Sequence, residues 1–213
     1  MEDWTKVSTI SQAFDLVRNE STKYEAEELP FRLGGYSQTD LTQHAAKLKT
    51  AIPDDVVEMY RLIRGVTDPF GPCLRCVTLL DLPATHWIDP REDPILREIE
   101  DEFPGWFDAK YFAIGQTEFG DTLAYCSNPP IGHHGAVLML DHERQGPEGS
   151  KTQPSIIVVY ADSLAQWLAR WATLGFEEFG YILEIKGLQS PLRERFAQDH
   201  ERLNPGVDVD VSF

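Results

Sequence analysis

The stretch that decides the fold is WFDAKYFAIGQTEFGDTLAYCSNPPIGHHGAVLMLDHE, residues 106–143. It holds three short β-prone runs, near 111–115, 122–126 and 135–140, separated by turns rich in acidic residues, glycine and proline. A fourth run near 155–160 follows a polar loop. The connections are too short for the crossovers that parallel strands require. The sequence therefore predicts an antiparallel meander.

Helical periodicity occurs on both sides of this stretch. Apolar residues recur at helical spacing over 8–19, and Ser37 with Asp40 predicts a variant of the capping box at the start of a second helix. Four further helices are predicted. One begins at Pro53, and a second is a short acidic helix marked by Ile95, Ile99 and Phe103. A third extends from Asp162 or Ser163 to Gly175, and a fourth begins at Ser190. Together with the meander, these helices predict an α+β fold with one mostly antiparallel sheet flanked by helices.

Length and charge limit the classes of function. The chain has 213 residues, which favours one domain or one domain with extensions, and its formal net charge is -16. Such a charge disfavours nucleic acid, whose phosphates would be repelled, and would steer a basic protein partner toward the surface. The alternative interpretation is that the acidic surface serves solubility alone.

Membrane and redox signals are weak. Apolar runs stay short of the roughly 18 residues that a membrane helix needs, and the first residues lack the basic and apolar regions of a secretory signal. Three cysteines, an odd number, fit a reducing compartment. We therefore expect a cytoplasmic protein with no membrane partner and no cofactor.

Several short motifs, taken in order, resemble the SUKH superfamily, which includes the fungal Smi/Knr cell-wall regulators. The helix start Ile52-Pro53-Asp54-Asp55 leads to Gly65, and a strand at Cys76–Leu80 and the aromatic Trp87 follow. The motifs continue with the turn Gly120-Asp121, the strand end Leu140-Asp141-His142-Glu143 (Leu140 stands where the family often has Trp), and Ala161-Asp162-Ser163-Leu164. The resemblance covers about 35–175, after an N-terminal segment 1–34 and before a C-terminal segment 176–213.

This resemblance implies a binding domain and assigns no catalytic residue. Most bacterial members of the family resemble immunity proteins that neutralise toxins, many of them nucleases, so the expected partner is a basic toxin domain. A regulatory or scaffold protein of the Smi/Knr type is the second hypothesis. A small hydrolase that uses Asp121, Asp141 and His142 is the third. The tail 207–211 alternates apolar and acidic residues like a half-buried strand, and could pair within the chain or across a homodimer.

Acidic residues are the candidate contacts for a basic partner. Asp121 either accepts backbone hydrogen bonds in its turn or anchors a partner's Arg or Lys. Aromatic residues would supply the apolar anchors, or else belong to the core. The full candidate set is Glu98, Asp101, Glu102, Asp121, Asp141, Glu143 and Trp106, with Trp87 and Phe107 as further aromatic candidates.

A metal site is the less favoured interpretation of the polar clusters. On a continuous strand Asp141 and Glu143 would point to one face and His142 to the other, so the three would not meet one ion easily, even with the nearby pair His133-His134. Cys73 and Cys76 form a single CxxC, and a structural zinc site needs four ligands. We therefore expect no bound metal.

Overall fold

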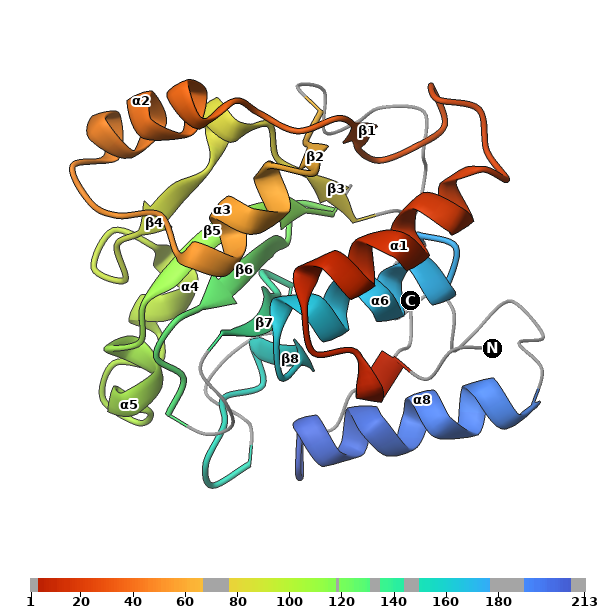
Figure 1. Ribbon diagram of the computed structural model, residues 1–213. Helices are drawn as coiled ribbons and strands as arrows, with labels where there is room; N and C mark the ends of the chain where they lie inside the picture. Colours follow the sequence, from red (N-terminus) through yellow and green to blue (C-terminus); the bar gives the residue numbers. More distant parts are fainter. Residues whose placement is uncertain are drawn as a thin grey trace.

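The computed structural model describes residues 4–66, 77–117, 119–130, 135–143, 150–176 and 190–207. These parts of the chain contain seven α-helices and one six-stranded antiparallel sheet (Figure 1). A separate two-stranded ribbon accompanies them. The predicted α+β class is confirmed. None of the helices in the described ranges is long and apolar enough to cross a membrane.

The predicted meander is present as four consecutive antiparallel strands. They are β5 (Tyr111–Gln116), β6 (Thr122–Cys126), β7 (Ala136–Leu140) and β8 (Ile157–Ala161). On the other side of β5, β3 (Thr78–Leu79) and β4 (His86–Ile88) pair with different parts of that strand. The order β3-β5-β6-β7-β8 leaves β8 as an edge strand of the sheet.

Local sequence signals set most helix starts. In α1 (Ile10–Ser21) and α6 (Leu164–Thr173), the hydroxyls of Thr9 and Ser163 accept a backbone N–H of the first turn. In α2 (Gln38–Leu48), Ser37 and Asp40 form the predicted reciprocal capping box. The remaining long helices are α3 (Asp54–Tyr60) and α8 (Ser190–Leu203).

The acidic segment differs from the prediction of one short helix. It forms two, α4 (Pro94–Arg97) and α5 (Pro104–Phe107), each with a proline in its first turn. Pro104 disfavours helical backbone at the residue before it, and Phe103 has φ -131° and ψ 58°. The helix therefore breaks before Pro104.

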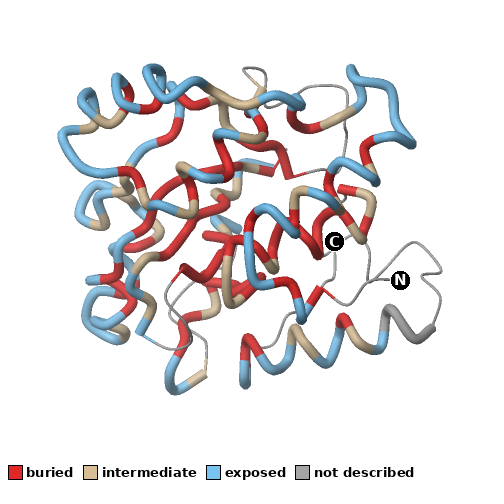
Figure 2. Tube along the Cα trace, viewed as in Figure 1, coloured by how far each residue is buried: buried red, intermediate tan, exposed pale blue. Residues whose placement is uncertain are grey.

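Hydrophobic side chains are buried on both faces of the sheet. One cluster joins the sheet to α1, α3 and α6, with Trp167 and Trp171 stacked at 4.9 Å between ring centroids. The other joins the opposite face to α4 and α5. Helix α8 contributes Phe196 to the first cluster and Leu203 to the second, so it lies across the β8 edge (Figures 1 and 2). Figure 2 shows buried residues along the central strands β5–β8 and a mostly exposed α2.

The two-stranded ribbon consists of β1 (Arg32–Leu33) and β2 (Ile63–Arg64). After β1 the chain runs very close to β2: a β-carbon at Gly35 would collide with the backbone carbonyl of Arg61. Glycine permits this approach because it has no side chain. Several predicted features lie outside the described residues: Cys73, Cys76, His133, His134 and the tail beyond Val207.

Candidate partner-binding surface

The exposed acidic surface between α4 and α5 contains three of the predicted residues. Glu98, Asp101 and Glu102 are exposed, and Glu100 beside them is exposed as well. Leu96 and Ile99 on the same segment are fully buried against the sheet. Backbone hydrogen bonds also brace it, including Phe103 N to Ile99 O at 2.8 Å. The carboxylates therefore project from a segment that the core holds in place.

Trp106 is not a surface anchor, which corrects one of the predicted contacts. It is 1% exposed, and its indole Nε1 donates to the carbonyl of Thr152 at 2.7 Å. Its own carbonyl accepts the Tyr111 hydroxyl. Phe107 is buried too, and Trp87 is half-buried with its ring edge-on to Phe112. Large aromatic side chains complete the core here because few other residues fill as much volume.

Asp121 links the β5–β6 turn to the end of β7. Its Oδ1 accepts the backbone N–H of His142 at 3.2 Å and lies 2.8 Å from Nδ1 of the same histidine. Its Oδ2 accepts the Thr117 hydroxyl at 3.0 Å. The carboxylate is thus occupied within the fold, which favours the turn role over that of an anchor for a partner's Arg or Lys.

The chain turns at Asp141 instead of continuing as a strand. Asp141 Oδ1 accepts the backbone N–H of Glu143 at 3.0 Å, while Glu143 and His142 are exposed. The alternation expected of a continuous strand therefore does not apply at these residues. In the described ranges no three metal-binding side chains come together.

A carboxylate that orients a histidine is a familiar part of hydrolytic sites. Here Asp121 holds Nδ1 of His142, and the other ring nitrogen, Nε2, belongs to a side chain that is 40% exposed. Among the described residues, however, no serine, threonine or cysteine side chain hydrogen-bonds that nitrogen. The described Cys126 is buried in the sheet, where burial raises the pKa of its thiol to about 12. In the described part of the chain, no serine, threonine or cysteine side chain is thus hydrogen-bonded to Nε2 of the pair.

A hollow of about 850 Å³ opens beside the acidic surface. Trp87, Ile88 and Phe107 give it apolar walls. Its charged residues have both signs: Asp89, Arg91, Asp108 and Lys110, all exposed. Its size is that of a small-molecule pocket, although it is open to solvent.

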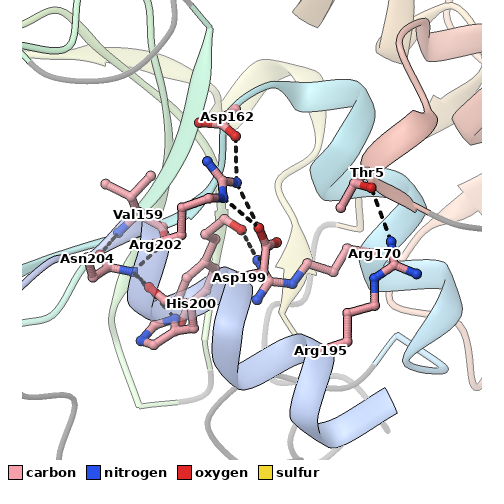
Figure 3. Close-up of polar contacts among 10 residues, drawn as sticks. Thr5, Val159, Asp162, Arg170, Arg195, Asp199, His200, Arg202 and Asn204 are labelled. Carbon is pink, nitrogen blue, oxygen red and sulfur yellow. Dashed lines mark hydrogen bonds and ion pairs between the residues drawn. The ribbon is translucent and has the colours of Figure 1, made fainter. Parts of the chain in front are cut away.

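A second polar cluster, under α8, was not predicted. Figure 3 shows Arg202 of α8 between Asp162 and Asp199, with Asp199 turned also toward Arg170 of α6. Arg170 is 1% exposed, lies 3.4 Å from Asp199 and stacks over the Phe196 ring at 4.1 Å. Burial lowers the pKa of its guanidinium to about 10, although Asp199 opposes that shift.

The same cluster contains Asn204, whose carboxamide is bonded to the edge of β8. Its Nδ2 donates to the Val159 carbonyl and its Oδ1 accepts the Val159 N–H, at 2.9 and 2.7 Å. Gln153 adds bonds to Asn204 Oδ1 and to the Ile157 carbonyl. Near the other end of α8, Arg195 stacks over Trp4 and donates to Thr5. This cluster attaches α8 to the rest of the fold. The sequence feature that could have indicated the cluster is Arg170, a charged residue within an apolar helix.

Comparison of the sequence with models of known protein families finds no match, and comparison with curated proteins finds none either. The resemblance to the SUKH superfamily therefore rests on the motifs of the sequence. The acidic surface between α4 and α5 is the part of the described structure that best fits a basic partner.

Proposed function

We propose that this chain is a non-enzymatic protein-binding domain, an immunity protein of the SUKH type that neutralises a basic toxin domain in the cytoplasm. The observation that carries the proposal is the exposed run Glu98, Glu100, Asp101 and Glu102, held by the buried Leu96 and Ile99. Four carboxylates on a braced segment form a surface that a cluster of Arg and Lys side chains can complement.

The net charge of the chain also favours binding of a basic partner. A net charge of -16 creates a negative potential around the molecule and speeds the approach of a basic domain. Exposed charge pairs mainly raise the association rate, while apolar contacts at the centre of an interface slow dissociation. The hollow lined by Trp87, Ile88 and Phe107 beside the carboxylates offers such contacts. A toxin inhibited in this way would be covered by an acidic surface that resembles its polyanionic substrate.

The test first searches for a toxin gene beside the gene of this chain, since its absence would favour the regulatory or scaffold hypothesis. The toxin domain is expressed in a bacterial host with and without this protein, and growth is measured. Rescue of growth, together with a complex whose association slows as salt rises, is the expected result. A toxin that stays active and unbound in the presence of the folded protein would overturn the proposal.

Two matched variants locate the surface. The first changes Glu98, Asp101 and Glu102 to Gln, Asn and Gln, and should slow association at low salt by about tenfold or more. The control makes the same change in charge elsewhere, at the exposed Glu27, Glu58 and Glu201. Equal effects of the two variants would mean that net charge, and not this surface, steers the partner.

A further inference from the structure

Three arginines lie on and next to the β1–β2 ribbon, which is at the top of the view in Figure 1, away from α4 and α5 at the left. Arg32 and Arg64 are directly opposite each other across the two strands, and Arg61 lies just before β2. All three are exposed. We refer to Arg32, Arg61 and Arg64 as the arginine patch.

This arrangement is unfavourable for the isolated fold. Residues directly opposite each other in an antiparallel pair project from the same face with their β-carbons about 5 Å apart, and like charges in that position repel. Within the described residues, none of the three arginines forms a salt bridge with a carboxylate. In a chain with 35 acidic and 19 basic residues, carboxylate partners would be easy to supply.

Two nearby carboxylates, those of Asp40 and Asp81, are engaged within the fold, and a third, Glu27, lines the hollow beside Arg32. Asp40 accepts hydrogen bonds from the backbone and hydroxyl of Ser37 in the capping box, and those bonds lower its pKa. Asp81 accepts the Tyr36 hydroxyl, and burial raises its pKa. Both carboxylates thus belong to the framework under the ribbon. Arg64 attracts Asp40 and Arg32 attracts Asp81, but neither pair forms a salt bridge in the described structure.

The fold also holds two of these arginines in defined positions. The Arg64 guanidinium lies 4.7 Å from the centre of the Tyr36 ring and donates to the Gly35 carbonyl at 3.0 and 3.2 Å. Arg61 donates to the Gln38 side chain. The Arg32 side chain makes no hydrogen bond within the described residues. Positioned guanidinium groups lose little conformational freedom when they bind a carboxylate in a bidentate manner.

An apolar hollow adjoins the patch at Arg32. It has a volume of about 400 Å³ and is lined by Ala26, Glu27, Leu29, Phe31, Arg32 and Leu33. Leu33, 48% exposed, is one of its walls. A ligand that satisfies both features carries an apolar side chain next to carboxylates.

We propose that the arginine patch and its hollow bind an acidic segment of a second protein, with an apolar side chain in the hollow and flanking carboxylates on Arg32, Arg61 and Arg64. The hollow favours a peptide over nucleic acid, because a phosphate backbone offers no apolar side chain. The charge of -16 also repels a long polyanion, whereas a short acidic segment meets the patch locally. This site is separate from the surface assigned to the basic partner and does not depend on it.

The test measures binding of a short acetylated, fluorescein-labelled peptide with leucine flanked by aspartates, by fluorescence anisotropy on the full chain. A peptide with asparagine in place of aspartate is the control ligand. The acidic peptide should bind and the neutral one should not. Arg32→Gln should weaken binding by about tenfold, the effect of losing one charged hydrogen-bonding group. The Arg32 side chain makes no hydrogen bond in the described structure, and the variant keeps the backbone pairing with β2, so it should fold.

The matched control variant is Arg91→Gln, which removes an exposed arginine beside the Trp87 hollow. Its affinity for the acidic peptide should equal that of the unchanged protein. Absence of peptide binding at millimolar concentration, or equal affinities for Arg32→Gln and Arg91→Gln, would overturn the proposal. So would a single-stranded oligonucleotide that binds more tightly than the peptide and loses affinity in Arg32→Gln.

Discussion

The side-chain amide of Asn204 pairs with both backbone groups of Val159, as a neighbouring strand would. Val159 lies in β8, at the edge of the sheet, where backbone N–H and C=O groups would otherwise lack a strand partner. Asn204 follows α8 and is 1% exposed. The end of α8 therefore closes the β8 edge through hydrogen bonds, while Phe196 and Leu203 pack on the two faces of the sheet.

Asn204→Ala should therefore destabilise the protein by about 2–4 kcal/mol, because it leaves buried backbone groups of Val159 without partners. Urea denaturation measures the free energy of unfolding, and hydrogen exchange at the Val159 amide reports the local opening. Asn19→Ala changes an asparagine of similar size that is exposed on α1 and should cost far less. Equal losses in the two variants would contradict this role of Asn204.

Asp199 compensates the buried charge of Arg170, so Asp199→Ala should cost about 3 kcal/mol of stability. Asp162→Ala is the matched control, because the ion pair of Asp162 is with Arg202, whose side chain is 52% exposed. An exposed pair contributes about 0–1 kcal/mol. Thermal unfolding of the two variants gives the comparison. A control as unstable as Asp199→Ala would show that burial of Arg170 does not decide the effect.

The sequence predicts the elements that depend on interactions between residues close together in the chain. The β5–β8 strands appear in the sequence as four short β-prone runs separated by turn residues. The Ser37–Asp40 capping box depends on residues three apart. The docking of α8 could not be predicted, because Asn204 and Val159 are 45 positions apart and their contact depends on the whole fold. Trp106 was misassigned for a similar reason: composition shows an aromatic side chain but not the Thr152 carbonyl that receives its N–H.

Because of His44, the free energy of unfolding should depend on pH in the mildly acidic range. His44 is 7% exposed, and its Nε2 lies 2.9 Å from the Thr85 hydroxyl oxygen and 3.2 Å from the Thr85 carbonyl. Burial lowers its pKa below the usual 6.5, with the charge of Lys47 in the same direction. The unfolded chain thus binds a proton at a higher pH than the folded chain, so stability is full above about pH 6.5 and falls as pH drops.

We expect a loss of less than about 1.4 kcal/mol per pH unit below that point, the limit for one titrating group. His44→Gln removes this titration, so its free energy of unfolding should vary less between pH 7 and pH 5 than that of the unchanged protein. Urea denaturation at several pH values measures both. His86→Gln, at an exposed histidine nearby, should keep the original pH dependence. An unaltered pH slope in His44→Gln would show that other groups produce it.

Asp121 should contribute to structure and not to catalysis. Asp121→Ala removes the contacts with Thr117 and His142 and should lower stability by about 1–2 kcal/mol, since a largely buried carboxylate loses several hydrogen bonds. His142→Ala removes a side chain that is 40% exposed and should cost less. Any hydrolysis of ester or phosphodiester substrates should be unchanged in His142→Ala. A large fall in such activity would restore the hydrolase hypothesis.

Replacement of Arg32 is expected to raise the stability of the fold, unlike the replacements above. Arg32→Gln relieves repulsion from Arg64 across the β1–β2 pair and breaks no hydrogen bond within the described residues, so it should raise the free energy of unfolding by about 0.5 kcal/mol. The gain should shrink as salt rises, because both side chains are exposed and ions screen them. Denaturation at low and high salt measures it, with Arg91→Gln as the control for loss of one positive charge. In a chain of charge -16, that control should be neutral or slightly destabilising. If Arg32→Gln stabilises the fold and also weakens peptide binding, the role of Arg32 is in binding. If Arg32→Gln destabilises the fold, Arg32 instead supports the ribbon itself.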